Sequence, residues 1–373
     1  MMKQANAQAI IQEFESFSPK SYAVEGDKIG LQVGTLNKQV KKVMVALDVI
    51  EPVVDEAIEA GVDLIIAHHP IIFRPIKALR TDQPYGRTIE KLIKHDITVY
   101  AAHTNLDVAP GGVNDLMAEA LGLENTDVLS ETTEDPLKKL VVFVPEEQAD
   151  AVREAIGTAG AGHIGNYSHC TFNTNGTGTF KPGEGTNPFI GKQGKMEFVP
   201  EVKVESVFYA SAEKRVLRAL LKAHPYEEPA YDIYDMANPG KPLGLGRIGE
   251  LPAEMSLRDF ASHVKTAFEV DGARVVGDLN RPVKKVGVLG GDGNKYVSSA
   301  LYKGADVYVT GDMYYHVAHD AMMDGLAIVD PGHNVEKIMK QAVKERIAAF
   351  IEAKNYDTEV IVSKLHTDPF QFV

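Results

Sequence analysis

Two adjacent histidines, His68 and His69, follow the apolar run 62–67 and precede a proline. Imidazole is the commonest metal ligand in proteins, and functional sites collect where the strands of α/β proteins end. Adjacent strand residues point to opposite faces, so one straight strand cannot direct both rings at one ion. A chain that turns at the strand end could present the rings to two ions. The alternative is a structural pair, with one ring satisfied in a core and the other in solvent.

Two further apolar runs end in residues that can bind metals. Run 98–102 leads into His-Thr-Asn-Leu-Asp, which ends at Asp107, and a carboxylate can bridge two cations because it offers two oxygens. Run 327–329 leads to His333 and Glu336, whose spacing puts them on one face of a first helical turn. The ends of three parallel strands would converge at one edge of a sheet. Alternatively these are capping or core polar residues, since His-x-x-Glu occurs by chance in many helices.

Together these residues form a ligand set of three imidazoles and two carboxylates: His68, His69, Asp107, His333 and Glu336. Five N and O ligands exceed what one tetrahedral zinc needs, but they suffice for two ions about 3.5–4 Å apart with a bridging oxygen. The set has no thiolate, so zinc, manganese, iron and other borderline or hard divalent ions all fit. We therefore expect two divalent metal ions per chain, with zinc as the first choice and iron or manganese as alternatives.

Two other segments contain candidate functional residues. Asp312 and His316 follow run 307–310; His316 could carry a proton, and Asp312 could hold a metal ligand or pair with His316. Equally, Asp312 could cap a helix, with His316 on its next turn. The glycine-rich segment 290–293 could cradle a phosphate at a helix N-terminus, but its Asp292 is acidic and a tight turn is favoured.

Strand and helix patterns alternate around these candidates. Strand 43–47, helix 51–60 and strand 62–67 form a β-α-β unit, which implies a mostly parallel sheet with a right-handed crossover. Asn114 is expected to cap a helix at 114–121. After residue 244 the alternation resumes and ends in a long helix at 335–353 and a strand at 359–363.

Residues 129–240 have a different pattern. The polar segments 130–136 and 238–242 look like linkers, and between them the order is strand, helix, two strands, helix and strand, as in ferredoxin-like domains. We therefore expect an α/β protein. Residues 1–128 and 241–373 would form the two halves of a main domain with mostly parallel sheets and flanking helices, and 129–240 an inserted ferredoxin-like α+β domain.

The composition excludes several classes of protein. Hydrophobic residues make up 44% and charged residues 24%, as in ordinary globular proteins, and no apolar run approaches the roughly 20 residues of a membrane span. The N-terminus has no signal-peptide core, and the single cysteine, Cys170, fits a reducing cytoplasm. A net charge of -13 argues against binding along a nucleic-acid backbone.

Five ordered motifs carry a family resemblance: Gly-Leu-Gln-Val-Gly at 30–34, Ala-His-His-Pro at 67–70, His-Thr-Asn-Leu-Asp at 103–107, Thr-Gly-Asp at 310–312 and Gly-His-Asn-Val-Glu at 332–336. They resemble the Nif-three-like dinuclear-metal protein family, also called GTP cyclohydrolase 1 type 2, over residues 1–128 and 241–373. The resemblance implies that the five-residue set holds two metal ions. Some members space the last pair one residue further apart, but position 337 here is lysine, so Glu336 is the match.

The segment 129–240 resembles the PII/CutA-like insertion of the long bacterial members, and His-Pro-Tyr-Glu-Glu-Pro at 224–229 is similar to a CutA segment. Such domains trimerise and the family forms toroidal hexamers, so the resemblance alone implies a homohexamer.

Two functions follow as hypotheses. The first is a metal-dependent hydrolase, in which a dimetal centre activates water near neutral pH and His316 shuttles a proton. Its substrate would be a small molecule such as a nucleotide or another phosphorylated compound. The GTP cyclohydrolase activity comes from the resemblance only, because the sequence has no guanine-recognition motif. The second is a non-enzymatic metal-binding or regulatory assembly whose inserted domain senses a small ligand. A nucleic-acid partner conflicts with the acidic charge, and no membrane partner is expected.

Overall fold

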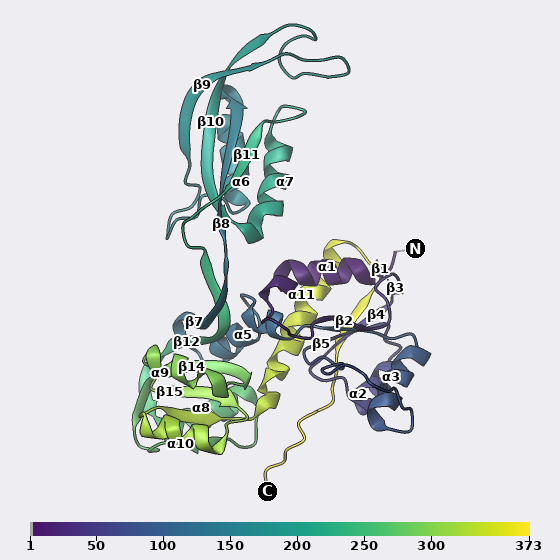
Figure 1. Cartoon of the computed structure of the whole chain (residues 1–373), viewed down its shortest axis with the longest axis vertical. Coiled ribbons are helices and arrows are strands. Elements are labelled where there is room, and N and C mark those ends of the chain that lie inside the picture. Colours follow the sequence, from purple (N-terminus) through teal and green to yellow (C-terminus); the bar gives the residue numbers. More distant parts are fainter. Residues whose placement is uncertain (1–2) are drawn as a thin grey trace. The chain divides into compact units, whose positions relative to one another are not determined.

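The structure is a computed structural model that describes residues 3–373, and its mixed α/β class confirms the predicted class. The chain divides into two compact units. The central unit is Glu134–Pro242, and the flanking unit combines the residues up to Thr133 with Leu243–Val373. Figure 1 colours the chain from purple through teal to yellow, with the central unit in teal. No helix among residues 3–373 has both the length and the hydropathy needed to cross a bilayer.

The first sheet of the flanking unit has five strands in the order β17-β4-β5-β6-β2. Their bounds are Gly30–Val33 (β2), Lys42–Ala46 (β4), Leu64–Ala67 (β5), Thr98–Ala101 (β6) and Glu359–Val362 (β17). Strands β17, β4, β5 and β6 are parallel to one another, and β2 is antiparallel to β6 at the edge. The parallel strands are almost wholly apolar because helices cover both faces of the sheet.

Helices α1 (Ala7–Phe17) and α11 (Met339–Ala353) lie on one face of this sheet, and α2 (Glu51–Glu59) and α3 (Pro84–Lys94) on the other (Figure 1). The alternation of β5 divides its side chains between two cores. Ile66 packs with α1 and α11, whereas Ile65 packs with α2 and α3.

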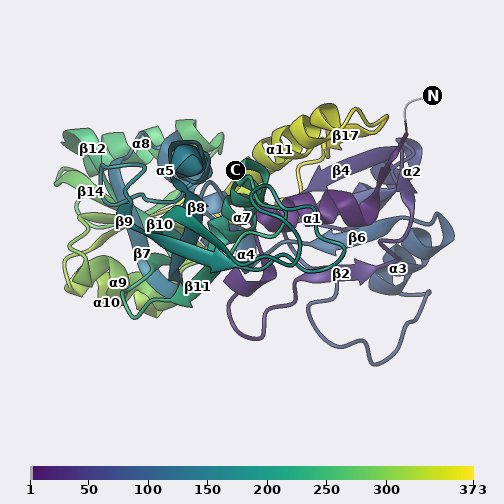
Figure 2. The ribbon, with the colours of Figure 1, turned by 90° about the horizontal axis from the view of Figure 1, so that it is seen from above.

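The second sheet has six strands in the order β13-β16-β15-β14-β12-β7. Their bounds are Glu124–Asp135 (β7), Lys241–Ser256 (β12), Arg274–Val276 (β13), Pro282–Asp292 (β14), Val307–Gly311 (β15) and Ala327–Asp330 (β16). Strands β14, β15 and β16 are parallel, whereas β12 and β13 are antiparallel to β14 and β16. Helices again cover both faces (Figure 2): α5 (Val113–Ala120) and α8 (Leu257–Phe268) on one, α9 (Val297–Tyr302) and α10 (Tyr315–Met323) on the other.

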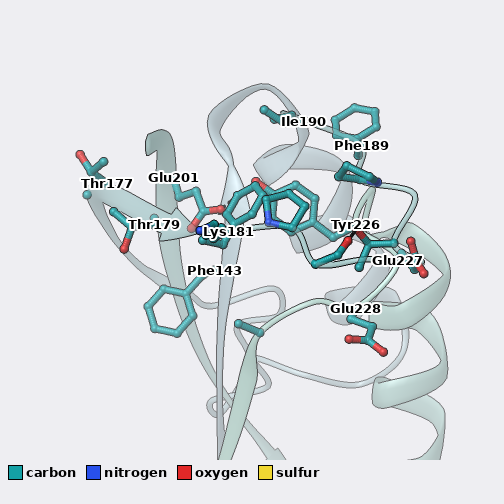
Figure 3. A pocket seen from close by; sticks show the side chains of 18 of the residues that line it. Phe143, Thr177, Thr179, Lys181, Phe189, Ile190, Glu201, Tyr226, Glu227 and Glu228 are labelled. Atoms are coloured by element: carbon teal, nitrogen blue, oxygen red, sulfur yellow. Dashed lines mark hydrogen bonds between the residues drawn. The ribbon is translucent and has the colours of Figure 1, made fainter. Parts of the chain in front are cut away.

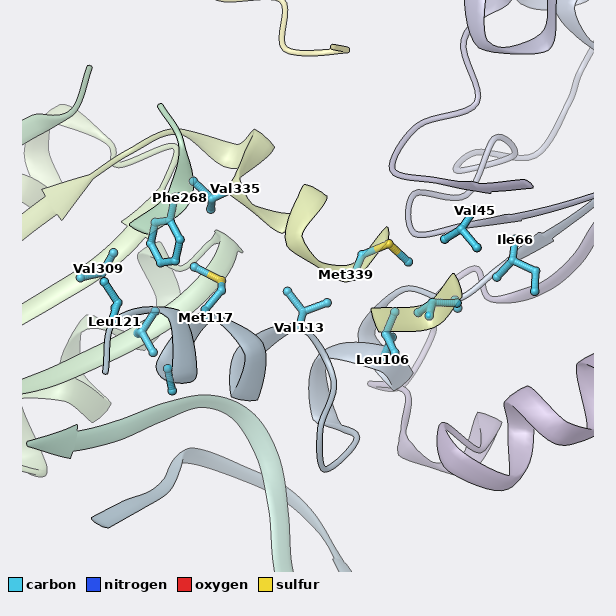
Figure 4. Close-up of a cluster of buried hydrophobic side chains, with 14 of the residues drawn as sticks. Val45, Ile66, Leu106, Val113, Met117, Leu121, Phe268, Val309, Val335 and Met339 are labelled. Atoms are coloured by element: carbon cyan, nitrogen blue, oxygen red, sulfur yellow. The ribbon is translucent and has the colours of Figure 1, made fainter. Parts of the chain in front are cut away.

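One continuous core joins the two sheets. It runs from Val45 and Ile66 of the first sheet, through Met339 of α11 and Met117 of α5, to Val309 of the second (Figure 4). All five side chains are fully buried. Because interiors are close-packed, this shared core fixes the carboxyl ends of one sheet's parallel strands relative to those of the other.

The central unit has the element order β-α-β-β-α-β. Its elements are β8 (Leu137–Pro145), α6 (Ala149–Thr158), β9 (Phe172–Phe180), β10 (Glu197–Tyr209), α7 (Glu213–Ala223) and β11 (Tyr231–Asp235). The strands form an antiparallel sheet in the order β11-β8-β10-β9. Apolar side chains such as Leu140 and Val204 pack against Val152 of α6 and Leu220 of α7.

Three predicted local structures were wrong. Most of the first predicted linker, 130–136, lies in β7. In the second predicted linker, 238–242, Lys241 and Pro242 begin β12. These polar segments form strands because they pair with each other at the sheet's end, so backbone hydrogen bonds outweigh their low strand propensity. The helix predicted from residue 335 begins at Met339, and a 3-10 turn, η5 (His333–Ile338), precedes it.

Candidate metal centre

Ligand-type side chains gather at the carboxyl ends of strands from both sheets. His68 and His69 follow β5, and Asp107 lies on the short helix α4 (Thr104–Val108) after β6. His333 and Glu336 lie on η5, directly after β16 of the second sheet. The expected convergence at one edge of one parallel sheet is therefore incorrect, because two sheets contribute. On a 3-10 turn, residues three apart eclipse each other, so His333 and Glu336 share a face.

Glu336 lies at the centre of the cluster. Its Oε1 is 3.6 Å from Nε2 of His68, and its Oε2 is 3.0 Å from Nε2 of His69 and 3.2 Å from Nε2 of His333. Oδ1 of Asp107 is 3.6 Å from Nε2 of His68. The structure thus contains two candidate metal-binding groups that share Glu336, one with His68 and Asp107 and one with His69 and His333. Glu336 belongs to both of these groups, whereas Asp107 belongs to one of them.

Each of the three imidazoles, His68, His69 and His333, forms a hydrogen bond through Nδ1 to a different acceptor outside the cluster. The Nδ1 atoms of His68, His69 and His333 lie 2.9, 2.7 and 2.7 Å from the Ala102 carbonyl oxygen, Asp48 Oδ1 and Asp312 Oδ2, respectively. Such contacts fix the tautomer and ring orientation of metal-binding histidines. Every Nε2 therefore points toward the carboxylates of the cluster.

Neighbouring carboxylates also perturb the protonation of these imidazoles. Burial lowers the pKa of His69, but its contacts with Asp48 and Glu336 outweigh burial and raise that pKa to about 10. For His333, Glu336 and Asp312 likewise overcome burial and raise the pKa to about 9. Burial raises the pKa of Asp107 to about 6, against the lowering effect of His68. Charges of both signs therefore lie close together in the cluster.

Two buried atoms of the cluster have no hydrogen-bond partner: Nε2 of His68 and Oδ1 of Asp107. His68 is 0% exposed and Asp107 is 7% exposed, so bulk water does not solvate them. An unsatisfied buried polar atom costs about 1–3 kcal/mol. Both atoms are good ligands for a divalent cation. The donor set and these unpaired atoms therefore fit a bound metal.

His103 is a further member of the site that the sequence prediction omitted. Its ring centroid lies 5.3 Å from that of His68, and it forms a third candidate metal-binding group with His68 and His69. Nδ1 of His103 is 2.9 Å from Oδ1 of Asp27, and Thr104 donates to Oδ2 of Asp27. Burial raises the pKa of Asp27, but these hydrogen bonds outweigh burial and hold it well below its usual range. His103 is the first residue of the His-Thr-Asn-Leu-Asp motif, and its place in this motif, directly after the apolar run, could have identified it as a candidate site residue.

The glycine-rich segment at the end of β14 forms a wall of the cluster. Gly291 has φ of +69°, and a Cβ there would lie 2.6 Å from Oε1 of Glu336. Asn114 accepts from the Gly290 N–H and donates to the carbonyl of Asp107, so it connects this wall to α4. The predicted capping role of Asn114 was wrong, because α5 begins at Val113 and Asn114 is buried.

Asp312 and His316 lie in different surroundings. Asp312 contacts His333 from a left-handed backbone conformation with φ of +53°. It does not cap α10, whose N-cap is Tyr314. His316 lies on α10, where it is exposed and its ring centroid is 5.3 Å from that of Tyr315. Among residues 3–373, the candidate metal-binding groups do not include His316.

The fold and the site together define an α/β protein with a candidate metal centre between the strand ends of two sheets. The chain belongs to the Duf34/NIF3 (NGG1p interacting factor 3) family, whose sequence model matches residues 5–369. The family predicted from the five motifs is thereby confirmed.

Relatives align over the full chain. Proteins named GTP cyclohydrolase 1 type 2 homolog from Halalkalibacterium halodurans and Bacillus subtilis are 65% and 61% identical to it, and each alignment covers 100% of both chains. Among solved structures, a Bacillus cereus protein related to NIF3 is 60% identical, with a TM-score of 0.89 and 100% coverage of both chains. A Staphylococcus aureus protein is 32% identical, with a TM-score of 0.72 and the same coverage.

Proposed function

We propose that the cluster binds two divalent metal ions and that the protein is a metal-dependent hydrolase acting on a small molecule. His68, Asp107 and Glu336 would hold one ion. His69, His333 and Glu336 would hold the other. The observation that carries the proposal is the sharing of Glu336 between two candidate groups, because a carboxylate with one oxygen toward each group is suited to bridge two ions.

The metals would supply a water of lowered pKa and a Lewis acid for a phosphoryl, carbonyl or imine oxygen. The chain would supply the proton transfer, and we assign it to His103 in place of the earlier candidate, His316. Because Asp27 engages Nδ1 of His103, Nε2 is the nitrogen that would exchange protons with water or substrate. The ionised Asp27 would hold the imidazole in this tautomer and orientation.

Zinc is the first metal to test, with iron and manganese as alternatives, because imidazole and carboxylate ligands suit all three. A nucleotide is the first substrate to test, because curated relatives are named GTP cyclohydrolase 1 type 2 homolog. Hydrolysis of guanine nucleotides is compatible with metal-activated water.

The experiment combines metal analysis with an assay of the metal-loaded full chain against nucleotides. We expect about two ions per chain and turnover above a His68→Ala/His69→Ala double variant. His95→Ala is the matched control, because His95 is an exposed histidine at the end of α3 and outside the candidate groups. Fewer than two ions per chain would contradict the dinuclear centre. Two ions without turnover above the double variant would contradict the hydrolase alone.

His103→Gln separates two roles for this residue. If His103 carries protons, the variant should keep its metals and lose turnover. If it is a ligand, the metal content should fall with the activity.

The competing hypothesis is a non-enzymatic metal-binding or regulatory assembly. It predicts ions without an exchangeable water, whereas a catalytic centre keeps an open position. We also propose that the central unit is an inserted ferredoxin-like domain of the PII/CutA type, which its element order and strand order support. A homohexamer stays a prediction from the family resemblance, and light scattering would test it. A cytoplasmic location stays a prediction from the single cysteine and the N-terminal sequence, and cell fractionation would test it.

A further inference from the structure

A pocket of about 810 Å³ lies within the central unit, and its volume falls in the range of small-molecule sites. Its walls come from β9 and β10, the segment that joins these strands, the segment after α7, and Phe143 of β8 (Figure 3). All the residues of this pocket belong to the central unit. It is therefore a different site from the candidate metal centre, which lies in the flanking unit.

Tyr226 provides a fixed aromatic surface in the pocket. Its ring centroid lies 5.7 Å from that of Phe180 and 6.4 Å from that of Phe189. Its backbone N–H donates to Nδ1 of His224, whose Nε2 donates to the carbonyl of Phe143. Burial lowers the pKa of His224, consistent with this neutral tautomer. The ring of Tyr226 is thus held from the backbone as well as by its aromatic neighbours.

Glu201 places a carboxylate beside this aromatic surface. Its side chain lines the pocket, and the residue is only 7% exposed. Oε1 accepts from the Tyr226 hydroxyl at 2.9 Å, and Oε2 has no hydrogen-bond partner among residues 3–373. Gly178, on the neighbouring strand, makes room for the carboxylate, because a Cβ there would overlap Oε2.

No cationic side chain of residues 3–373 forms an ion pair with Glu201. Lys203, two residues along the same strand, pairs instead with Glu205 at 3.3 Å. Because the Glu201 carboxylate lines the pocket and no cationic side chain is paired with it, it favours a positively charged ligand. The whole lining has the same bias, since it contains four glutamates and two lysines. Anionic ligands such as phosphates are correspondingly disfavoured.

We propose that this pocket binds a small organic cation, a protonated amine or quaternary ammonium on an apolar body. The charged nitrogen lies at the Glu201 carboxylate, and the apolar body packs on Tyr226 and Phe180. Aromatic faces attract such cations, and the Glu201 carboxylate adds a charge-assisted contact. The site goes beyond the proposed hydrolase function and does not depend on it.

The test titrates the metal-loaded full chain with 2-phenylethylammonium and follows binding by calorimetry and NMR. Two further probes have nearly the same shape: 2-phenylethanol is neutral, and 3-phenylpropanoate is anionic. We expect the cation to bind at least about tenfold more tightly than the alcohol, and the anion not to bind. Equal binding of cation and alcohol, preference for the anion, or no binding of the cation would each overturn the proposal.

Variants locate the binding. Glu201→Gln should weaken binding of the cation by about tenfold or more, which corresponds to loss of a charged hydrogen bond. Glu147→Gln is the matched control, because Glu147 is an exposed acid of the same unit outside the pocket, and it should leave the affinity unchanged. Tyr226→Phe keeps the ring and removes only the hydroxyl, so it should retain binding. If Glu201→Gln does not fold, comparing Tyr226→Phe with Tyr226→Ala locates the binding instead. Tyr226→Ala should abolish binding of the cation. Unchanged affinity in Tyr226→Ala or in a folded Glu201→Gln variant would overturn the assignment.

Discussion

Metal binding to the metal-free protein should release at least two protons per chain near pH 7.5. Carboxylates raise the pKa of His69 to about 10 and that of His333 to about 9, so both imidazoles are protonated before metal arrives. A metal ligand must be the neutral imidazole, so the ion held by His69 and His333 displaces both of these protons. Asp107, with a pKa of about 6, and Glu336, whose pKa is lowered well below its usual value, are already ionised and add few protons.

The same protons set the pH dependence of affinity. Displacing two protons makes the overall binding constant for the two ions rise about 100-fold per pH unit, and the rise should flatten as pH approaches about 9–10. Stability of the metal-free protein changes in the opposite direction. The raised histidine pKa values stabilise the folded state below the unfolded pKa near 6.5, and this contribution disappears as pH rises through about 9–10.

Calorimetry measures the proton count directly. Zinc is titrated into chelator-treated protein in buffers of different ionisation enthalpy at one pH, and the slope of observed against buffer enthalpy gives the protons released. Asp48→Asn is the control: its amide can still accept from His69, but without the negative charge the pKa of His69 falls. The plateau of affinity should therefore begin at lower pH. Release of less than one proton, or affinity that falls as pH rises, would refute this account of the cluster.

Three further outcomes are expected. Gly291→Ala should reduce the metal content by about half or more, since its methyl group would lie 2.6 Å from Oε1 of Glu336. Gly61→Ala is the control, because Gly61 has nearly the same φ with open space around it, and this variant should keep its metal. Thr367→Val should weaken metal binding by about tenfold in a competition titration, because the Thr367 hydroxyl donates to Asp48. Ile66→Ala should lower the free energy of unfolding by about 2–5 kcal/mol in urea denaturation, because Ile66 is fully buried.

The local sequence determined where along the chain most of the strands end and which residues follow them. Strands β5, β6 and β16 are short and buried on both faces, so their apolar runs are continuous and end sharply at polar residues. The candidate ligands stand just after these runs, where the chain leaves the sheet. Strand β7 lacks such a signal, because it is polar and depends on pairing within the sheet.

Tertiary structure alone decided how these residues combine. Asp27 and His103 are separated by 76 residues, yet they form a hydrogen bond. The central position of Glu336 and the wall formed by Gly291 depend on how one sheet packs against the other through the shared core. Apolar periodicity specifies which face of an element is buried, but it does not specify which strand end of another sheet that packing brings near. The sequence by itself therefore determined the candidate ligands, and the packing of the two sheets determined which of them meet at Glu336.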